Sequence, residues 1–255
     1  MKLHFNDLAG SIAESKTPAS GVSPGEVHVW SHKLRAEDSF FAHATRMLSE
    51  AELDKANKYH FEKDKKLYMA GHVFARNVIA HYTSLEPNEL RFAQEGNMKP
   101  HLVDSPIKIK FNLSHSEELV LIAVGFDNDV GIDTEFIMDN FDTDGFAESN
   151  FHENELAEFR KLKGDEQADH FYKIWTLKEA FLKLTGEGIN DHLRDIDFSG
   201  NKSSIKYPGG APRDLWLCSW KRKDNYICSL ASDRSEPKVR FFESSLVESL
   251  LNEDF

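Results

Sequence analysis

The chain has 255 residues, enough for one large domain or two small ones, and its 40% hydrophobic content with 19 Phe allows an ordinary core. Its formal net charge is −12, and the acids concentrate in the second half: residues 1–128 hold 15 Lys and Arg against 17 Asp and Glu, whereas residues 129–255 hold 16 against 26. This balance argues against a nucleic-acid-binding protein, which needs a basic face, and suits a site that gathers carboxylates around a divalent cation.

Targeting signals and disulfides are not expected. No apolar run is long enough for a transmembrane helix, and the first ten residues lack the basic and apolar segments of a secretory signal. The only cysteines, Cys218 and Cys228, lack the CxxC spacing of zinc sites, and we expect both to be reduced. These features predict a cytoplasmic protein without a membrane span.

The first half is predicted to begin with an arm and then to mix strands with helices. Residues 1–25 are expected to form the arm, because this stretch is rich in Ser, Ala, Gly and Pro. Ser49 and Glu52 form a capping-box pattern, and Asp64 is expected to cap a long helix. The predicted strands span residues 26–31, 91–94, 107–113 and 119–124, and the predicted helices span residues 40–48, 49–58 and 64–78.

The second half repeats this order of elements. Its acidic residues 139–150 are expected to form a loop. The predicted strands span residues 130–136, 195–198, 203–207, 215–220, 226–231 and 238–242, and the predicted helices span residues 153–162, 167–184 and 244–251. The repeated order predicts an α+β fold with two similar halves, residues 26–128 and 129–255.

The helix predicted over residues 167–184 carries the motif WTLKEAFLK at 175–183. Residues four apart lie on one helical face, so Trp175, Glu179 and Lys183 form a stripe. The carboxylate and the ammonium of this stripe could serve a site or form an ordinary surface ion pair. Gly186 is expected to end the helix.

Two carboxylates lie close together on a predicted strand. Asp133 and Glu135 are two residues apart, so their side chains point to the same side. Adjacent carboxylates repel unless a cation lies between them, and Mg²⁺ binds carboxylate and phosphate oxygens. The alternative is a pair of solvated acids on an edge strand.

Two further motifs hold candidate polar groups. In FNLSHS at 111–116, Ser114 and His115 are expected at a turn, where they could bind an anion or make local hydrogen bonds. Glu155 opens a predicted helix, where the helix dipole stabilises an acid whether or not it is functional. Phosphate-binding GxxxxGK[ST] and GxGxxG loops and the HExxH zinc motif are absent from the sequence.

In order and spacing, these motifs resemble those of the surfactin-synthetase-type 4′-phosphopantetheinyl transferases. The motifs that carry the resemblance are Lys-Pro at 99–100, FNLSHS at 111–116, GIDTE at 131–135, FHENE at 151–155 and WTLKEAFLKLTGEGI at 175–189. The resemblance implies two pseudo-symmetric α+β halves with coenzyme A in the cleft between them. It also implies Mg²⁺-dependent transfer of phosphopantetheine from coenzyme A to a serine of an apo acyl or peptidyl carrier protein, which releases adenosine 3′,5′-bisphosphate.

The resemblance also implies roles for individual residues. The metal ligands would be Asp133, Glu135 and Glu179, the catalytic residues Glu155 as base and Lys183 at the pyrophosphate, and the coenzyme A contacts Lys55, Lys99, Ser114, His115 and Lys183. We expect a monomer that binds neither nucleic acid nor membrane, with apolar contacts around Phe151 docking the carrier.

The sequence departs from the family pattern in one helix that should contact the 3′-phosphate of coenzyme A. Glu52 stands where the family has a second lysine, one turn before Lys55. An alternative reading is therefore a catalytically weak scaffold of the same fold that binds nucleotide or carrier without transfer. Another is a Mg²⁺-dependent transferase of this fold that acts on a different phosphodiester or acceptor.

Overall fold

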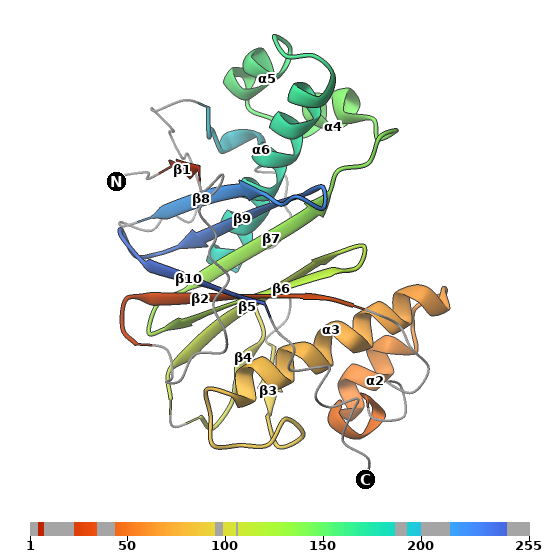
Figure 1. Ribbon diagram of the computed structural model, residues 1–255, viewed down its shortest axis with the longest axis vertical. Coiled ribbons are helices and arrows are strands. Elements are labelled where there is room, and N and C mark those ends of the chain that lie inside the picture. Colours follow the sequence, from red (N-terminus) through yellow and green to blue (C-terminus); the bar gives the residue numbers. More distant parts are fainter. Residues whose placement is uncertain are drawn as a thin grey trace.

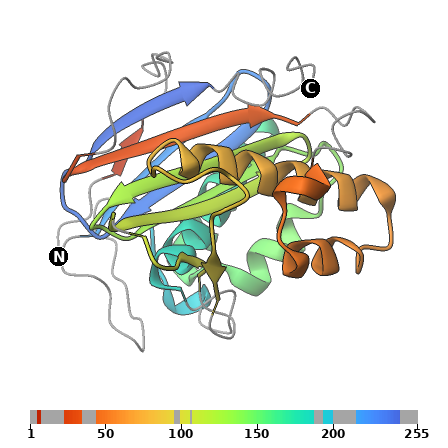
Figure 2. The ribbon, with the colours of Figure 1, turned by 90° about the horizontal axis from the view of Figure 1, so that it is seen from below.

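The computed structural model describes residues 5–7, 23–34, 44–94, 99–105, 107–186, 193–199 and 215–243. Within them the chain forms two four-stranded sheets, with long helices on the outer side of each (Figure 1). The predicted α+β class is confirmed. Viewed from below, α3 lies across the sheet of the first half (Figure 2).

The first half supplies one long helix and most of one sheet. That sheet has the order β10-β2-β6-β5, and a separate β3-β4 pair lies beside it. The elements of this half are β2 (Glu26–Lys33), α2 (Glu50–Ala56), α3 (Glu62–Ala80), β3 (Phe92–Ala93), β4 (His101–Leu102), β5 (Ile109–Ser116) and β6 (Leu119–Phe126). The capping box on Ser49 is confirmed, since its hydroxyl accepts from Glu52 N and the Glu52 carboxylate accepts from Ser49 N.

The second half supplies the helices of the other layer and the remaining strands. Its sheet has the order β1-β8-β9-β7. The elements are β7 (Val130–Phe136), α4 (Thr143–Asn150), α5 (Glu153–Phe159), α6 (Gly164–Thr185), the 3-10 turn η1 (Leu193–Asp195), β8 (Trp216–Lys221), β9 (Tyr226–Ser232) and β10 (Lys238–Glu243). Helix α6 ends as predicted at Gly186, whose φ of 82° favours glycine.

The first and last described strands of the chain each pair with a strand far away in the sequence. Strand β1 (Phe5–Asp7) pairs in parallel with β8, although it belongs to the predicted irregular arm. Strand β10 pairs in parallel with β2 and so completes the sheet of the first half. The predicted boundary at residue 129 therefore does not separate the two sheets, because β10 of the second half completes the sheet of the first, and β1 of the predicted arm joins the sheet of the second.

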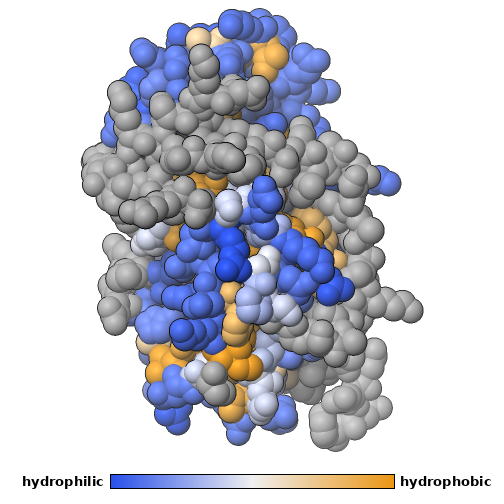
Figure 3. Space-filling model, turned by 90° about the vertical axis from the view of Figure 1, so that its left-hand side faces the viewer, coloured by the Kyte–Doolittle hydropathy of each residue, from blue (hydrophilic) through white to orange (hydrophobic). Residues whose placement is uncertain are grey.

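Side-chain alternation along the strands creates three hydrophobic layers. On β2, Trp30 faces the α3 side, whereas Val27 and Val29 face the opposite sheet. On β7, Val130 and Ile132 enter that same layer between the sheets. A third cluster lies between α6 and the second sheet. Because the apolar faces are buried in this way, the described residues on the face shown in Figure 3 are mainly hydrophilic, with separate apolar patches between them.

Several sequence predictions need correction. Residues 143–150 form helix α4 instead of an acidic loop, because Asp142 accepts a hydrogen bond from Gly145 N and Ala147 is buried. Helix α3 starts at Glu62 without a side-chain cap, two residues before the expected cap. At residues 195–198, predicted as a strand, Asp195 ends a 3-10 turn, Ile196 forms a single β-bridge, and the two residues that follow are irregular.

Other predictions lie outside the described residues or are confirmed. The expected strand 203–207 and helix 244–251 fall outside them, as does part of the expected helix 40–48. Cys218 and Cys228 are both free and buried, as expected. No helix in the described part of the chain combines the length and apolar character needed to cross a membrane.

Candidate active site

The three predicted metal ligands come from one strand and the helix packed on it. Asp133 and Glu135 lie on β7, and Glu179 lies on α6. Gly131 permits the close approach, because a Cβ atom at this position would overlap the backbone at Ala180 and Leu184. The glycine of the GIDTE motif therefore lets the helix that carries Glu179 lie against the strand that carries Asp133.

Lys183 reaches the same acids from one turn further along α6. Its Nζ donates to Asp133 Oδ1 at 2.6 Å and to Ser114 Oγ at 3.0 Å. Ser114 in turn donates to Asp133 Oδ1 at 2.9 Å. Lys183 therefore pairs with Asp133 on β7, and not with Glu179 as an ion pair on the surface of the helix.

Glu135 is held separately by neighbours on two other elements. Ser116 Oγ donates to Glu135 Oε2 at 2.8 Å, and it accepts from Phe136 N at 3.0 Å. Trp175 also makes a hydrogen bond to Glu135 that lowers its pKa. The tryptophan of the WTLKEAFLK motif thus links α6 to the acidic strand.

The negative charge of Asp133, Glu135 and Glu179 is only partly compensated by the ammonium of Lys183. Burial, followed by repulsion from Asp133, raises the pKa of both Glu135 and Glu179 to about 7. Lys183 opposes this rise but does not abolish it. The acids therefore carry more buried negative charge at neutral pH than the one nearby ammonium offsets.

Two oxygens of this group have no partner at all. Asp133 Oδ2 and Glu179 Oε1 are buried without a hydrogen bond. Unpaired buried acceptors are costly, and a hard cation that binds oxygen would satisfy both. As they stand, the described residues nevertheless include no group of three or more His, Cys, Asp or Glu side chains close enough to hold a metal together. The carboxylate oxygens are the kind of ligand that Mg²⁺ prefers, but the three side chains would have to move closer together to bind one ion.

Strand β5 contributes a row of polar side chains that the sequence interpretation placed wrongly. Ser114 and His115 lie within β5 and not at a turn. Asn112 and Ser116, on the same face as Ser114, also reach β7, and Asn112 Oδ1 accepts from Ile132 N at 2.8 Å. Neither was predicted as a site residue, although the alternation of Asn, Ser and Ser in FNLSHS is a visible signal.

A cavity of about 240 Å³ lies at the C-terminal end of α6. Its lining includes Lys99, Lys110 and Gly186. Lys99 Nζ donates to Val130 O at 2.6 Å, and burial lowers its pKa to about 8. Lys99 therefore lines this cavity while its ammonium is tied to the start of β7.

The two expected 3′-phosphate contacts lie on different elements. Partial desolvation of the His115 ring, followed by repulsion from Lys183 and His72, lowers its pKa, although the residue as a whole is exposed to solvent. Lys55 on α2 lies over the Tyr68 ring, 5.6 Å from its centroid. Within the described part of the chain, no hydrogen bond joins Lys55 to His115.

Glu52, the departure from the family pattern, has a structural role here. Its carboxylate accepts from Arg76 Nη2 at 2.6 Å and lies 3.0 Å from His72 Nδ1. Arg76 is buried and also donates to the carbonyls of Pro87 and Leu90. These partners hold the pKa of Glu52 low, at about 2, against the opposing effect of burial. The acid therefore joins α2 to α3.

Glu155 does not have the surroundings expected of a catalytic base. It is fully buried, and Lys178 Nζ lies 2.7 Å from its Oε2. Its oxygens also accept from His152 N at 2.9 Å and Phe198 N at 2.8 Å. No hydrogen bond between described residues joins Glu155 to the three acids near Lys183. This burial and pairing argue against its predicted role as base.

Phe151 is also unsuited to its predicted role in carrier docking. Its side chain is fully buried and stacks on Phe171 in the core beneath α6. The exposed large apolar side chains nearby are instead Met138, 47% exposed, and Phe146, 44% exposed. The sequence did not show that the Phe151 ring is buried while Phe146, five residues earlier, faces solvent.

Comparisons with known proteins match both halves of the chain. The family described as the 4′-phosphopantetheinyl transferase superfamily matches residues 129–231. The family described as 4′-phosphopantetheinyl transferase, N-terminal, matches residues 32–126. The two matches meet at the junction between the halves.

Individual relatives agree with the family matches. The 4′-phosphopantetheinyl transferase HetI of Nostoc sp. is 34% identical over 176 residues, which cover 68% of this chain and 74% of HetI. The 4′-phosphopantetheinyl transferase Sfp of Bacillus subtilis is 31% identical and covers 56% of this chain and 62% of its own length. The human L-aminoadipate-semialdehyde dehydrogenase-phosphopantetheinyl transferase is 28% identical over 167 residues, which cover 61% of this chain and 53% of the human protein. The chain belongs to the 4′-phosphopantetheinyl transferase superfamily.

Proposed function

We propose that this chain transfers 4′-phosphopantetheine from coenzyme A to a serine of an apo acyl or peptidyl carrier protein. In the reaction, the serine oxygen bonds to the phosphorus next to pantetheine, and the hydroxyl proton is released. The pyrophosphate bridge breaks, and adenosine 3′,5′-bisphosphate leaves with the bridging oxygen. The observation that carries the proposal is the ion pair of Lys183 with Asp133, together with the unpartnered buried oxygens of Asp133 and Glu179.

The residues of this chain are assigned roles that follow from their positions. Asp133, Glu135 and Glu179 would hold Mg²⁺. When bound, Mg²⁺ supplies positive charge to the pyrophosphate, where phosphoryl transfer needs neutralisation more than covalent help. Lys183 places an ammonium where charge develops on the leaving group.

The coenzyme A contacts are assigned to the neighbouring surfaces. Lys99 lines the cavity next to α6, and Ser114 and His115 lie on adjacent positions of β5. Lys55 extends from α2 over the ring of Tyr68. A 3′-phosphate would gain charge-assisted hydrogen bonds from the lysine and the imidazole.

We also propose that the protein acts as a monomer in the cytoplasm. One chain supplies both sides of the site, since Ser114 comes from the first half and Asp133 and Lys183 from the second. Two free, buried cysteines fit a reducing compartment.

The function is tested by mass spectrometry of an apo acyl carrier protein incubated with this chain, coenzyme A and Mg²⁺. The expected result is a mass gain of one phosphopantetheine on the carrier serine, with release of adenosine 3′,5′-bisphosphate. A carrier with its serine replaced by alanine is the control. Binding of coenzyme A without any mass gain would contradict the proposal and support the scaffold alternative.

Metal binding is expected to stabilise the fold in a pH-dependent way. The pKa of Glu135 and Glu179, about 7, lies above the ordinary value of 4.5, so their contribution to stability is present below about 4.5 and lost as pH rises through about 7. Mg²⁺ binds the ionised acids and should offset that loss. We therefore expect Mg²⁺ to raise the Tm more at pH 8 than at pH 5.5, measured by differential scanning fluorimetry.

Two variants test whether the Mg²⁺-dependent Tm shift comes from these acids and not from other titrating groups. Glu179→Gln should remove most of the Mg²⁺-dependent shift at pH 8. Asp169→Asn, on the same helix but paired with Lys221 away from the acids, should behave like the wild type. An equal Mg²⁺ shift at both pH values would show that these carboxylates do not hold the ion.

A further inference from the structure

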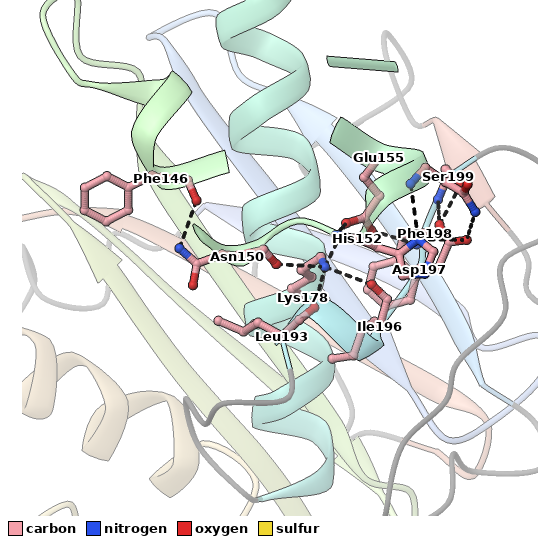
Figure 4. A network of polar contacts seen from close by, with 11 residues as sticks. Phe146, Asn150, His152, Glu155, Lys178, Leu193, Ile196, Asp197, Phe198 and Ser199 are labelled. Carbon is pink, nitrogen blue, oxygen red and sulfur yellow. Dashed lines mark hydrogen bonds and ion pairs between the residues drawn. The ribbon is translucent and has the colours of Figure 1, made fainter. Parts of the chain in front are cut away.

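A buried lysine next to Glu179 ties together several segments of the second half. Lys178 is fully buried, and its Nζ lies 2.7 Å from the Glu155 carboxylate. It donates to the carbonyl oxygens of Leu193 at 2.6 Å and Ile196 at 2.8 Å, and more weakly to Asn150 at 3.3 Å. Figure 4 shows these bonds converging on one nitrogen in the interior. A single ammonium thus contacts the end of α4, the first turn of α5, the start of η1 and the residue after it.

Glu155 completes the connections from the other side. Its Oε2 accepts from His152 N, which starts α5, and its Oε1 accepts from Phe198 N. Beyond it, Asp197 accepts from Asn154 Nδ2 at 2.7 Å. Every polar atom of the pair is satisfied, so the two charges need no further partner to remain buried. A group in proton exchange with a substrate would instead need a free lone pair within reach of that substrate.

The segments held by this pair lead to the exposed apolar residues near the acids. We call α4 and α5, residues 143–159, the cap. Phe146 lies in the cap, its carbonyl accepts from Asn150 Nδ2 at 2.9 Å, and its ring lies 6.4 Å from the ring of Trp175. Trp175 hydrogen-bonds Glu135. The cap therefore places an exposed phenylalanine one side chain away from the proposed metal ligands.

Helix α6 has other supports that the cap lacks. It packs along β7 and β9, with backbone contact at Gly131, and its apolar face is buried against the sheet. The cap packs on α6 through Phe151 and Phe159, which contact Phe171, and its polar connections to α6 centre on Lys178. Loss of the pair should therefore leave α6 and its acids in position and loosen the cap, whose remaining contacts with α6 are mainly apolar.

We propose that Lys178 and Glu155 form a positioning pair that fixes the cap on α6, so that Phe146 presents a preformed docking surface to the carrier protein. The pair does not exchange protons in the reaction. This inference rests on the proposed function, since the docked partner is the carrier whose serine must reach the acids. Carrier docking to the cap would explain why a large aromatic side chain stays exposed beside them.

The experiment compares the wild type with the double variant Lys178→Met/Glu155→Gln. Removing both charges avoids the isolated buried charge that either single change would leave, so this variant is expected to fold. Steady-state kinetics with apo acyl carrier protein, coenzyme A and Mg²⁺ should show a carrier KM raised about tenfold or more, with kcat within about threefold and the coenzyme A KM unchanged. Lys173→Met, another lysine of α6, is the matched control and should match the wild type.

A second measurement tests the link between the pair and Phe146. Phe146→Ser alone should also raise the carrier KM, and it should have a much smaller effect in the double variant, because the displaced cap no longer presents residue 146 to the carrier. If the double variant instead turned over about 100-fold more slowly or worse, Glu155 would be catalytic, since base catalysis contributes about 10²–10⁴-fold. An unchanged carrier KM, or fully additive effects with Phe146→Ser, would also overturn the proposal. Failure of the wild type to transfer phosphopantetheine would reject the proposed function itself.

Discussion

Asp133→Ala and Glu179→Ala should each reduce turnover by at least about 100-fold, the size of effect seen when one electrostatic contact to a transition state is removed. Each change deletes a carboxylate that has an unpartnered buried oxygen next to Lys183 or Glu135. The loss should appear in kcat, because the missing charge would hold Mg²⁺ at the pyrophosphate. Transfer to an apo carrier protein, followed by mass spectrometry, measures it.

The fold should survive the Glu179 change, and this distinguishes a lost site from a lost structure. The raised pKa of Glu179 shows that its charge is disfavoured in the metal-free protein. Its removal should therefore leave the Tm in chelator equal to or above that of the wild type. Asp169→Asn again serves as the control, since its partner Lys221 lies elsewhere on the surface. Near wild-type turnover in either alanine variant, with Mg²⁺ as the only metal, would refute the metal assignment.

Gly131→Ala should destabilise the protein by about 3 kcal/mol or more, at or beyond the upper end of ordinary overpacking. The added methyl group would overlap the carbonyl of Ala180 and the backbone of Leu184, which cannot rotate away as a flexible side chain could. Helix α6 would have to move off β7, carrying Glu179 and Lys183 away from Asp133. Both the free energy of unfolding and the Mg²⁺-dependent Tm shift should therefore fall together.

Gly71→Ala is the matched control for that change. Gly71 lies inside α3, and a methyl group there would meet only Val120 Cγ2 at 3.8 Å, an ordinary contact. Alanine is favoured over glycine in helices, so this variant should gain about 0.5–1 kcal/mol. Urea unfolding of the two variants gives the comparison. If Gly131→Ala were as stable as Gly71→Ala, this result would contradict the close packing of α6 on β7 at Gly131.

Local sequence patterns identified the elements that carry the acids. The period of WTLKEAFLK predicted the helix with Glu179 and Lys183, and the alternation in GIDTE predicted that Asp133 and Glu135 share a face. The capping box at Ser49 was also predictable from the sequence. These features depend on residues within one or two turns or along one strand, so the sequence contains what is needed to predict them.

Local patterns gave the wrong structure where contacts with distant segments opposed the short-range preference. The acidic composition of residues 139–150 suggested a loop, but Asp142 caps a helix there whose Ala147 is buried. Ser and His in FNLSHS suggested a turn, but β6 pairs with the strand through Ser116. In both cases, contacts with distant segments outweighed the local preference.

The role of each charged group was decided by the tertiary structure. Nothing in FHENE distinguishes a catalytic acid from one buried against Lys178, because the partner lies 23 residues further along the chain and the enclosing carbonyls lie further still. Glu52, likewise, is explained only by Arg76 and His72 on α3. Sequence alone determined the family, the site motifs and the elements that carry them. Only folding decided which carboxylates remain without a compensating charge, because desolvation and pairing are set by whichever distant segments pack around each group.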